Sequence, residues 1–182
     1  MAQATSLPWA GPAASSTAGS TANAALRIRP ATRADRNAVR KMESACFGWM
    51  RNFFGLSPKV GNVGNSDARV WIADIDGQPA GYLISYLKPL HGEKTLYVGG
   101  VGTLPACRKR GVAEALMREV FAIDSRVWLH VRASNAAAIK LYDKLGMHIA
   151  ERLPKFYSNG EDALVMCSRT LHGCAEIETA QA

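Results

Sequence analysis

Residues 101–120 read VGTLPACRKRGVAEALMREV, and they join the end of a strand to the start of a helix. After Gly111 the apolar side chains recur at helical spacing, at Val112, Ala115, Leu116, Val120 and Ile123. The first N–H groups of a helix are unpaired and lie at the positive end of its dipole. The stretch therefore predicts a helix over 112–123 whose first turn can receive an anion.

The loop before this helix carries three successive cations, Arg108, Lys109 and Arg110. Gly111 and Ala113 leave the backbone bare enough for a phosphate to approach it. Taken alone, these residues are more typical of a solvated basic turn than of a phosphate site. The neighbouring segments decide between the two.

The strand that leads into the loop, predicted over 95–104, carries three glycines, Gly99, Gly100 and Gly102. Glycine weakens the interior of a strand, and it often marks a bulge or the close approach of another molecule. We therefore expect an irregular strand immediately before the basic loop.

The rest of the chain alternates between strand and helix patterns. The predicted order is strand, helix, three strands, helix, strand, helix and two strands, at 26–30, 32–46, 69–75, 80–87, 95–104, 112–123, 127–132, 135–145, 147–153 and 163–169. Aromatic residues within 47–56 predict a short helix or a packed loop. This order predicts a single α/β domain with a mixed, mostly antiparallel central sheet flanked by helices.

The composition suits one globular domain of 182 residues, with 48% hydrophobic and 20% charged residues. A net charge of +7 attracts polyanions but does not choose among nucleic acid, anionic lipid and a phosphorylated cofactor. The four cysteines show no metal-binding spacing, so we expect reduced thiols and no metal. No apolar stretch approaches the roughly 20 residues that span a bilayer, and no membrane partner is expected.

Two tails are predicted to flank the domain. Residues 1–25 are rich in Ala, Ser and Thr and carry no charged side chain from Ala2 to Ala25, which predicts a disordered segment. A chloroplast-type transit peptide is the alternative, although a cytoplasmic protein is favoured. The domain is expected over 26–171, followed by a flexible tail at 172–182.

Several segments together resemble the GNAT superfamily of N-acetyltransferases over about residues 26–170. Arg108–Ala113 resembles that family's acetyl-CoA pyrophosphate loop, Gln/Arg-x-x-Gly-x-Gly/Ala, and VGTLP at 101–105 resembles its bulged fourth strand. LHVRASNAAAIKLYDKLG at 129–146 and KFYSNGEDA at 155–163 are similar to stretches of N-terminal acetyltransferases and of bacterial ribosomal-protein alanine acetyltransferases.

The resemblance implies a GNAT fold and acetyl transfer from acetyl-CoA to the α-amino group of a protein N-terminus, by direct attack and without a metal. Acetyl-CoA is expected between the fourth and fifth strands, with the Val101 N–H as oxyanion donor. The cofactor-binding residues implied are Val101, Gly102, Thr103, Arg108, Lys109, Arg110, Gly111, Val112, Ala113, Asn135 and Tyr142.

The implied catalytic residues are Tyr97, His130 and Tyr142. In one branch of the family a tyrosine and a histidine at the positions of Tyr97 and His130 deprotonate the amine through water. A neutral imidazole with a pKa near 6.5 suits an α-amine with a pKa of about 7.7–8.0. The bacterial branch places a glutamate base where this chain has Ile149. Tyr142 resembles the tyrosine that protonates the departing thiolate, and its helical spacing equally fits a packing role.

The implied peptide contacts are Phe47, Trp49 and Tyr157. Gly48 replaces a proline common in the family, and Phe156 replaces the first of two paired tyrosines. The alternatives are a lysine or small-amine acetyltransferase, and a CoA-binding module without turnover. Association with the ribosome is left open, and specific nucleic-acid binding is not expected because the basic residues lack interleaved aromatics.

Overall fold

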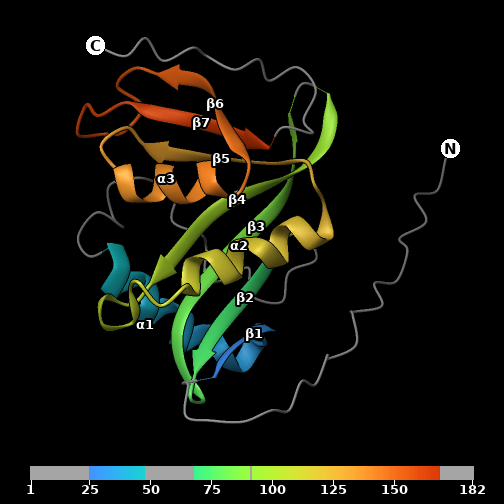
Figure 1. Cartoon of the computed structure of the whole chain (residues 1–182), viewed down its shortest axis with the longest axis vertical. Coiled ribbons are helices and arrows are strands. Elements are labelled where there is room, and N and C mark those ends of the chain that lie inside the picture. The colour runs from blue at the N-terminus through green and yellow to red at the C-terminus, as the bar shows by residue number, and fades with distance from the viewer. Residues whose placement is uncertain (1–24, 48–67, 91, 169–182) are drawn as a thin grey trace, which may run out of the picture.

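A computed structural model describes residues 25–47, 68–90 and 92–168 of the chain (Figure 1). Apart from Ala25, both predicted tails lie outside these residues, as do residues 48–56 of the segment predicted to form a short helix or a packed loop. In the described part of the chain, no helix is long and apolar enough to cross a bilayer.

The chain forms a seven-stranded sheet in the order β1-β2-β3-β4-β5-β7-β6. Only the β4–β5 pair is parallel, and the other five pairs are antiparallel. The elements are β1 (Leu26–Pro30), η1 (Arg33–Asp35), α1 (Arg36–Phe47), β2 (Ala68–Ile75), β3 (Gln78–Leu90), β4 (Glu93–Thr103), η4 (Pro105–Cys107), α2 (Val112–Ile123), β5 (Val127–Arg132), α3 (Ala136–Lys144), β6 (Met147–Leu153) and β7 (Ala163–Ser168). The predicted fold class and element order are confirmed.

One strand is longer than predicted. β3 runs to Leu90, whereas the predicted strand ended at residue 87, before Lys88 and Pro89. Proline removes a donor from the sheet ladder and usually marks the end of a strand. Here Pro89 pairs with Lys94 next to the hairpin turn, and Lys88 pairs with Thr95. The extension places Lys88 on the ordered sheet.

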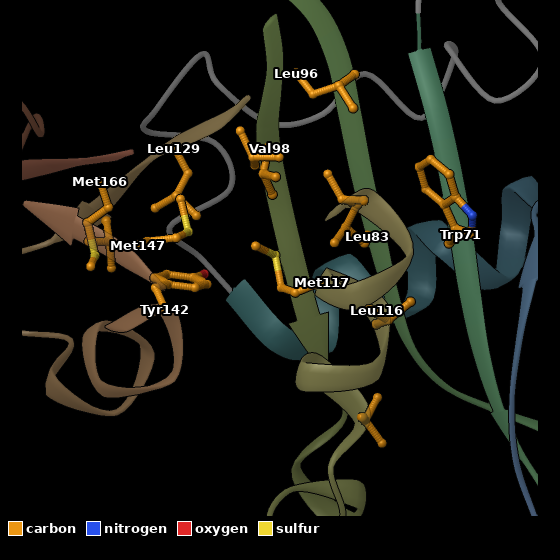
Figure 2. Packing of buried hydrophobic residues seen from close by; sticks show 14 of the residues in the cluster. Trp71, Leu83, Leu96, Val98, Leu116, Met117, Leu129, Tyr142, Met147 and Met166 are labelled. Atoms are coloured by element: carbon orange, nitrogen blue, oxygen red, sulfur yellow. The ribbon is translucent and has the colours of Figure 1, made fainter. Parts of the chain in front are cut away.

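The helices cover opposite faces of the sheet. Figure 1 shows α2 and α3 on the near side and α1 on the far side. Alternate residues of β2 and β3 divide accordingly, because successive side chains of a strand point to opposite faces. Ile72 and Tyr82 pack with Val39 of α1, whereas Leu83 belongs to the larger cluster with Leu116 of α2 (Figure 2). A third cluster, around Trp128, lies on the α1 side of β5 and β7.

Hydrogen bonds between Thr32 and Asp35 fix the start of the first helical segment. The Thr32 N–H donates to Asp35 Oδ2 at 2.7 Å, and the Thr32 hydroxyl donates to the same oxygen at 2.9 Å. Two further hydrogen bonds from the Arg29 guanidinium hold the pKa of Asp35 well below its usual range. These contacts fix α1 against β1.

Candidate active site

β4 and β5 separate in the middle of the sheet, and the candidate site lies around this separation. Their parallel ladder has three pairs and ends at Val98 with Leu129. Beyond it, β4 pairs only with β3, and Gly99 is an extra residue between the Ser85–Val98 and Ile84–Gly100 pairs. A Cβ at Gly99 would lie 2.6 Å from Cε2 of Tyr86, so only glycine fits there without movement. The predicted bulge is confirmed.

Tyr97 and His130 meet beside this separation. Tyr97 forms the middle pair of this ladder with Trp128. His130 lies on β5 one residue past the end of the ladder. The Tyr97 hydroxyl is 3.1 Å from His130 Nδ1, which is hydrogen-bonding distance. Both side chains lie on the α1 side of the sheet, opposite α2 and α3. The structure therefore brings together two residues that are 33 positions apart in the sequence.

Aromatic rings extend from this pair to the β6–β7 loop. The ring centroids of Tyr97 and Trp128 are 4.6 Å apart, and those of His130 and Phe156 are 4.7 Å apart in a stacked arrangement. Phe156 contacts Tyr157 at 5.2 Å, edge to face. We call these five rings the aromatic wall. Trp128 is fixed within it, because its Nε1–H donates to Thr95 Oγ1 at 3.0 Å.

The wall changes the acid–base properties of the pair. Burial, reinforced by the nearby Lys88 ammonium, lowers the pKa of His130 from 6.5 to about 4. Burial also raises the pKa of Tyr97 to about 12, with smaller contributions from Tyr157 and Tyr86. At neutral pH both groups are therefore uncharged. His130 is a weaker base than the ordinary histidine assumed from the sequence.

Tyr142 approaches from the other face of the sheet. Its side chain is 6% exposed and belongs to the main core, where Figure 2 shows it near Met147 and Leu129. The packing role foreseen for Tyr142 is confirmed. Burial raises the pKa of its hydroxyl well above the usual value, and Tyr157 adds to the shift.

The basic loop adopts an unusual backbone. Lys109 and Gly111 both have positive φ, at 60° and 76°, and a left-handed conformation is costly for a lysine. A Cβ at Gly111 would meet nothing within 4 Å, so the space in front of α2 is open. Arg108, Lys109 and Arg110 are exposed, and none forms a salt bridge to another described residue. Their charges remain available to an anion at the start of α2.

The other predicted cofactor contacts lie on β4 and at the starts of α2 and α3. Val101, Gly102 and Thr103 form the part of β4 that has left β5, and Val112 and Ala113 begin α2. Asn135 caps α3, with its Oδ1 accepting from the Ala138 N–H at 3.2 Å. Asn135 is therefore the N-cap of α3, and its amide N–H groups remain available as donors.

Tyr157 is held by a polar network that was not predicted from the sequence. The Arg132 guanidinium lies 4.0 Å from the Tyr157 ring centroid and forms a salt bridge with Glu161. Glu161 also accepts from the Ser134 hydroxyl at 2.5 Å, which lowers the pKa of its carboxyl group to about 2. The signal available was the period of two in β5, which places Arg132 on the His130 face.

The structure does not bring the remaining described candidate residues to the Tyr97–His130 pair. Phe47 ends α1 and packs against the cluster beneath that helix, whereas Trp49 lies outside the described residues. Glu151, a carboxylate on β6, is exposed and pairs with Val165, the residue opposite His130 on the next strand. Two strand spacings, about 10 Å, separate Glu151 from His130. Within the described ranges, no three His, Cys, Asp or Glu side chains are arranged to hold a metal.

Comparisons with known proteins identify the class to which this fold and site belong. The model of the acetyltransferase (GNAT) family matches residues 36–147. An N-alpha-acetyltransferase of Sulfurisphaera tokodaii is 34% identical over 117 residues, which are 56% of this chain and 70% of that relative. The N-terminal acetyltransferase A complex catalytic subunit NAA10 of Arabidopsis thaliana is 34% identical over 100 residues, 51% of this chain and 52% of that relative. The chain thus spans about half the length of the plant protein.

Solved structures show the same fold. The ribosomal-protein-S18-alanine N-acetyltransferase of Escherichia coli has a TM-score of 0.66 at 21% identity, over 87% of this chain and all of that one. Arabidopsis thaliana NAA60 with a bisubstrate analogue has a TM-score of 0.64 at 23% identity, covering 79% of this chain and 97% of that one. With the family match covering more than half of its residues, the chain belongs to the acetyltransferase (GNAT) family.

Proposed function

We propose that this acetyltransferase transfers the acetyl group of acetyl-CoA to the α-amino group of protein N-termini. The observation that carries the proposal is the hydrogen-bonded Tyr97–His130 pair beside the point where β4 leaves β5. An amine on the α1 side of the sheet and a thioester from the α2 side would meet there.

The residues present fit acetyl-CoA. The open space at Gly111, the cations of Arg108–Arg110 and the first N–H groups of α2 suit a pyrophosphate. The part of β4 from Val101 to Thr103 has no partner on its β5 side and offers backbone groups to an extended arm. Acetyl-CoA supplies an activated acetyl thioester when it binds.

The proposed proton transfers follow from the two faces of the site. His130 accepts the proton that the attacking amine loses through one water, and the neutral Tyr97 hydroxyl, hydrogen-bonded to His130, can relay it. The Val101 N–H stabilises the negative charge that develops on the carbonyl oxygen. Tyr142 supplies a proton to the departing sulfur as the carbon–sulfur bond breaks. No acyl-enzyme is required.

The low pKa of His130 favours an α-amine over a lysine. At pH 7 an α-amine with a pKa near 7.8 is about 14% neutral, whereas a lysine near 10.4 is about 0.04% neutral. A base with a pKa of about 4 takes a proton from an ammonium group only at a large energetic cost. The favoured acceptor is therefore the one that already arrives neutral. The names of the relatives, N-alpha-acetyltransferase among them, support the same substrate class.

The proposal is tested by direct competition within one peptide. A peptide with a free N-terminus and one internal lysine is incubated with acetyl-CoA and the enzyme, and tandem mass spectrometry locates the acetyl group. We expect early acetylation at the α-amine in excess of about a hundredfold, in line with the difference in neutral fraction. A product acetylated mainly on lysine would instead establish the alternative, a lysine or small-amine acetyltransferase.

A further inference from the structure

Lys88 occupies one end of the aromatic wall. Its Nζ lies 4.7 Å from the Tyr97 ring centroid and 4.8 Å from the Trp128 ring centroid, so it contacts both rings as a cation. Its main chain is also fixed, because the Lys88 carbonyl accepts a hydrogen bond from the Thr95 hydroxyl. The ammonium group is thus held beside the Tyr97–His130 pair although the residue is exposed.

The cation at the other end of the wall differs in its surroundings. Arg132 lies over Tyr157, and Glu161 neutralises it. None of the side chains described by the structure supplies such a carboxylate to Lys88. The positive potential of Lys88 reaches the site itself, since it acts on His130. A substrate that brings its own carboxylate would complete this end of the wall.

We propose that Lys88 is a specificity-determining residue that selects acceptors with an acidic side chain at one of their first two positions. This inference rests on the proposed function, because it assumes that the α-amine lies at Tyr97 and His130. A peptide in that position would place its first two side chains next to the aromatic wall and Lys88. A carboxylate there gains an ion pair with Lys88, whereas a second cation is repelled.

The test uses peptides that differ in a single atom group. Two pairs carry Asp or Asn, in one pair at the first position and in the other at the second, with no other charged side chain. We expect kcat/KM to favour Asp over Asn in at least one pair by about threefold to tenfold, the size expected for one ion pair at a partly exposed site. The preference should shrink as salt is added, because the pair is screened.

Substitutions then assign the preference to Lys88. Lys88→Met should remove it, Lys88→Glu should reverse it, and Lys88→Arg should preserve it. Lys94→Met is the matched control, since it removes the same charge from an exposed residue on the opposite face of the sheet and should leave the preference intact.

The outcomes separate this inference from the proposed function. Equal rates for Asp and Asn peptides in both pairs, or a preference that survives in Lys88→Met, would overturn the role of Lys88 alone. If none of the free N-termini is acetylated while a lysine peptide is, the proposed function fails first.

Discussion

At the scale of single residues, His130 illustrates how its surroundings determine its chemistry. Stacking on Phe156 and contact with Trp128 remove the imidazole from water, and Lys88 places a positive charge nearby. Both effects disfavour the imidazolium. In the proposed function, His130 would act as a neutral hydrogen-bond acceptor for Tyr97 or a water, and it would hold the geometry of the proton path as much as receive the proton.

Removing either member of the pair should slow the chemical step. We expect His130→Ala and Tyr97→Phe each to lower kcat by about 10²–10⁴-fold, the usual value of general acid–base assistance. Acetyl-CoA affinity, measured by calorimetry, should change little because the cofactor contacts lie on the other side. As both residues act on one proton, the double variant should lose less than the product of the single losses. Nearly wild-type rates in both single variants would move the base elsewhere, with Glu151 the next residue to test.

Acid stability should report the lowered pKa of His130. Between pH 4 and 6.5, His130 is mostly protonated in the unfolded protein and mostly neutral in the folded protein. The free energy of unfolding therefore rises with pH across this window. The difference between wild type and His130→Gln, measured by urea unfolding, should be constant above pH 6.5 and should move against the wild type below it. The other histidines are common to both proteins and cancel. Parallel pH profiles would show that His130 is not perturbed.

The sequence predicted some of these residues and missed others for definable reasons. Tyr97 and His130 were predicted through the family resemblance, because no spacing along the chain brings them together. Lys88 was missed because the predicted strand ended at residue 87, one residue before it. The pKa of His130 could not be foreseen, because it depends on rings contributed by three separate segments.

At the scale of elements, the start of α2 and the bulge in β4 shape the cofactor side. Both were foreseen from glycine positions, since Gly99 and Gly111 occupy places where a side chain would clash or strain the backbone. The order of strands and helices was also predicted, because period-two and helical patterns alternate cleanly. Those patterns report local structure only, so they could not predict the order of strands in the sheet or the separation of β4 from β5.

Gly111→Glu should abolish acetyl-CoA binding. In wild type, saturation at a hundred times Kd adds about 2.7 kcal/mol of stability and raises Tm. The glutamate places a side chain and a negative charge where the phosphates are expected. Gly77→Glu is the matched control, since Gly77 also has a positive φ, at 75°, and open space around it, but lies in the β2–β3 turn. We expect both variants to lose similar intrinsic stability, and only Gly111→Glu to lose the shift in Tm. A full shift in Gly111→Glu would show that the phosphates bind elsewhere.

At the scale of the whole molecule, the proposed function places its two substrates on opposite faces of the sheet. α2 and α3 cover one face and contribute the anion site and Tyr142, while the opposite face carries Tyr97, His130 and the aromatic wall. In the proposed function the amine and the thioester would meet where the β4–β5 ladder ends, and no covalent relay would be needed. The proposed function therefore depends on where the acceptor nitrogen lies relative to Tyr97 and His130.

A crystal structure of the protein with a bisubstrate analogue, a peptide N-terminus joined to CoA through an acetyl linker, tests that claim most directly. We expect the linked nitrogen to lie within hydrogen-bonding reach of Tyr97 or His130, directly or through one water, and the sulfur to lie beside Tyr142. The pyrophosphate should contact the first turn of α2 at Gly111. A complex in which the nitrogen sits away from Tyr97 and His130, with the peptide leaving by the α2 face, would contradict the account.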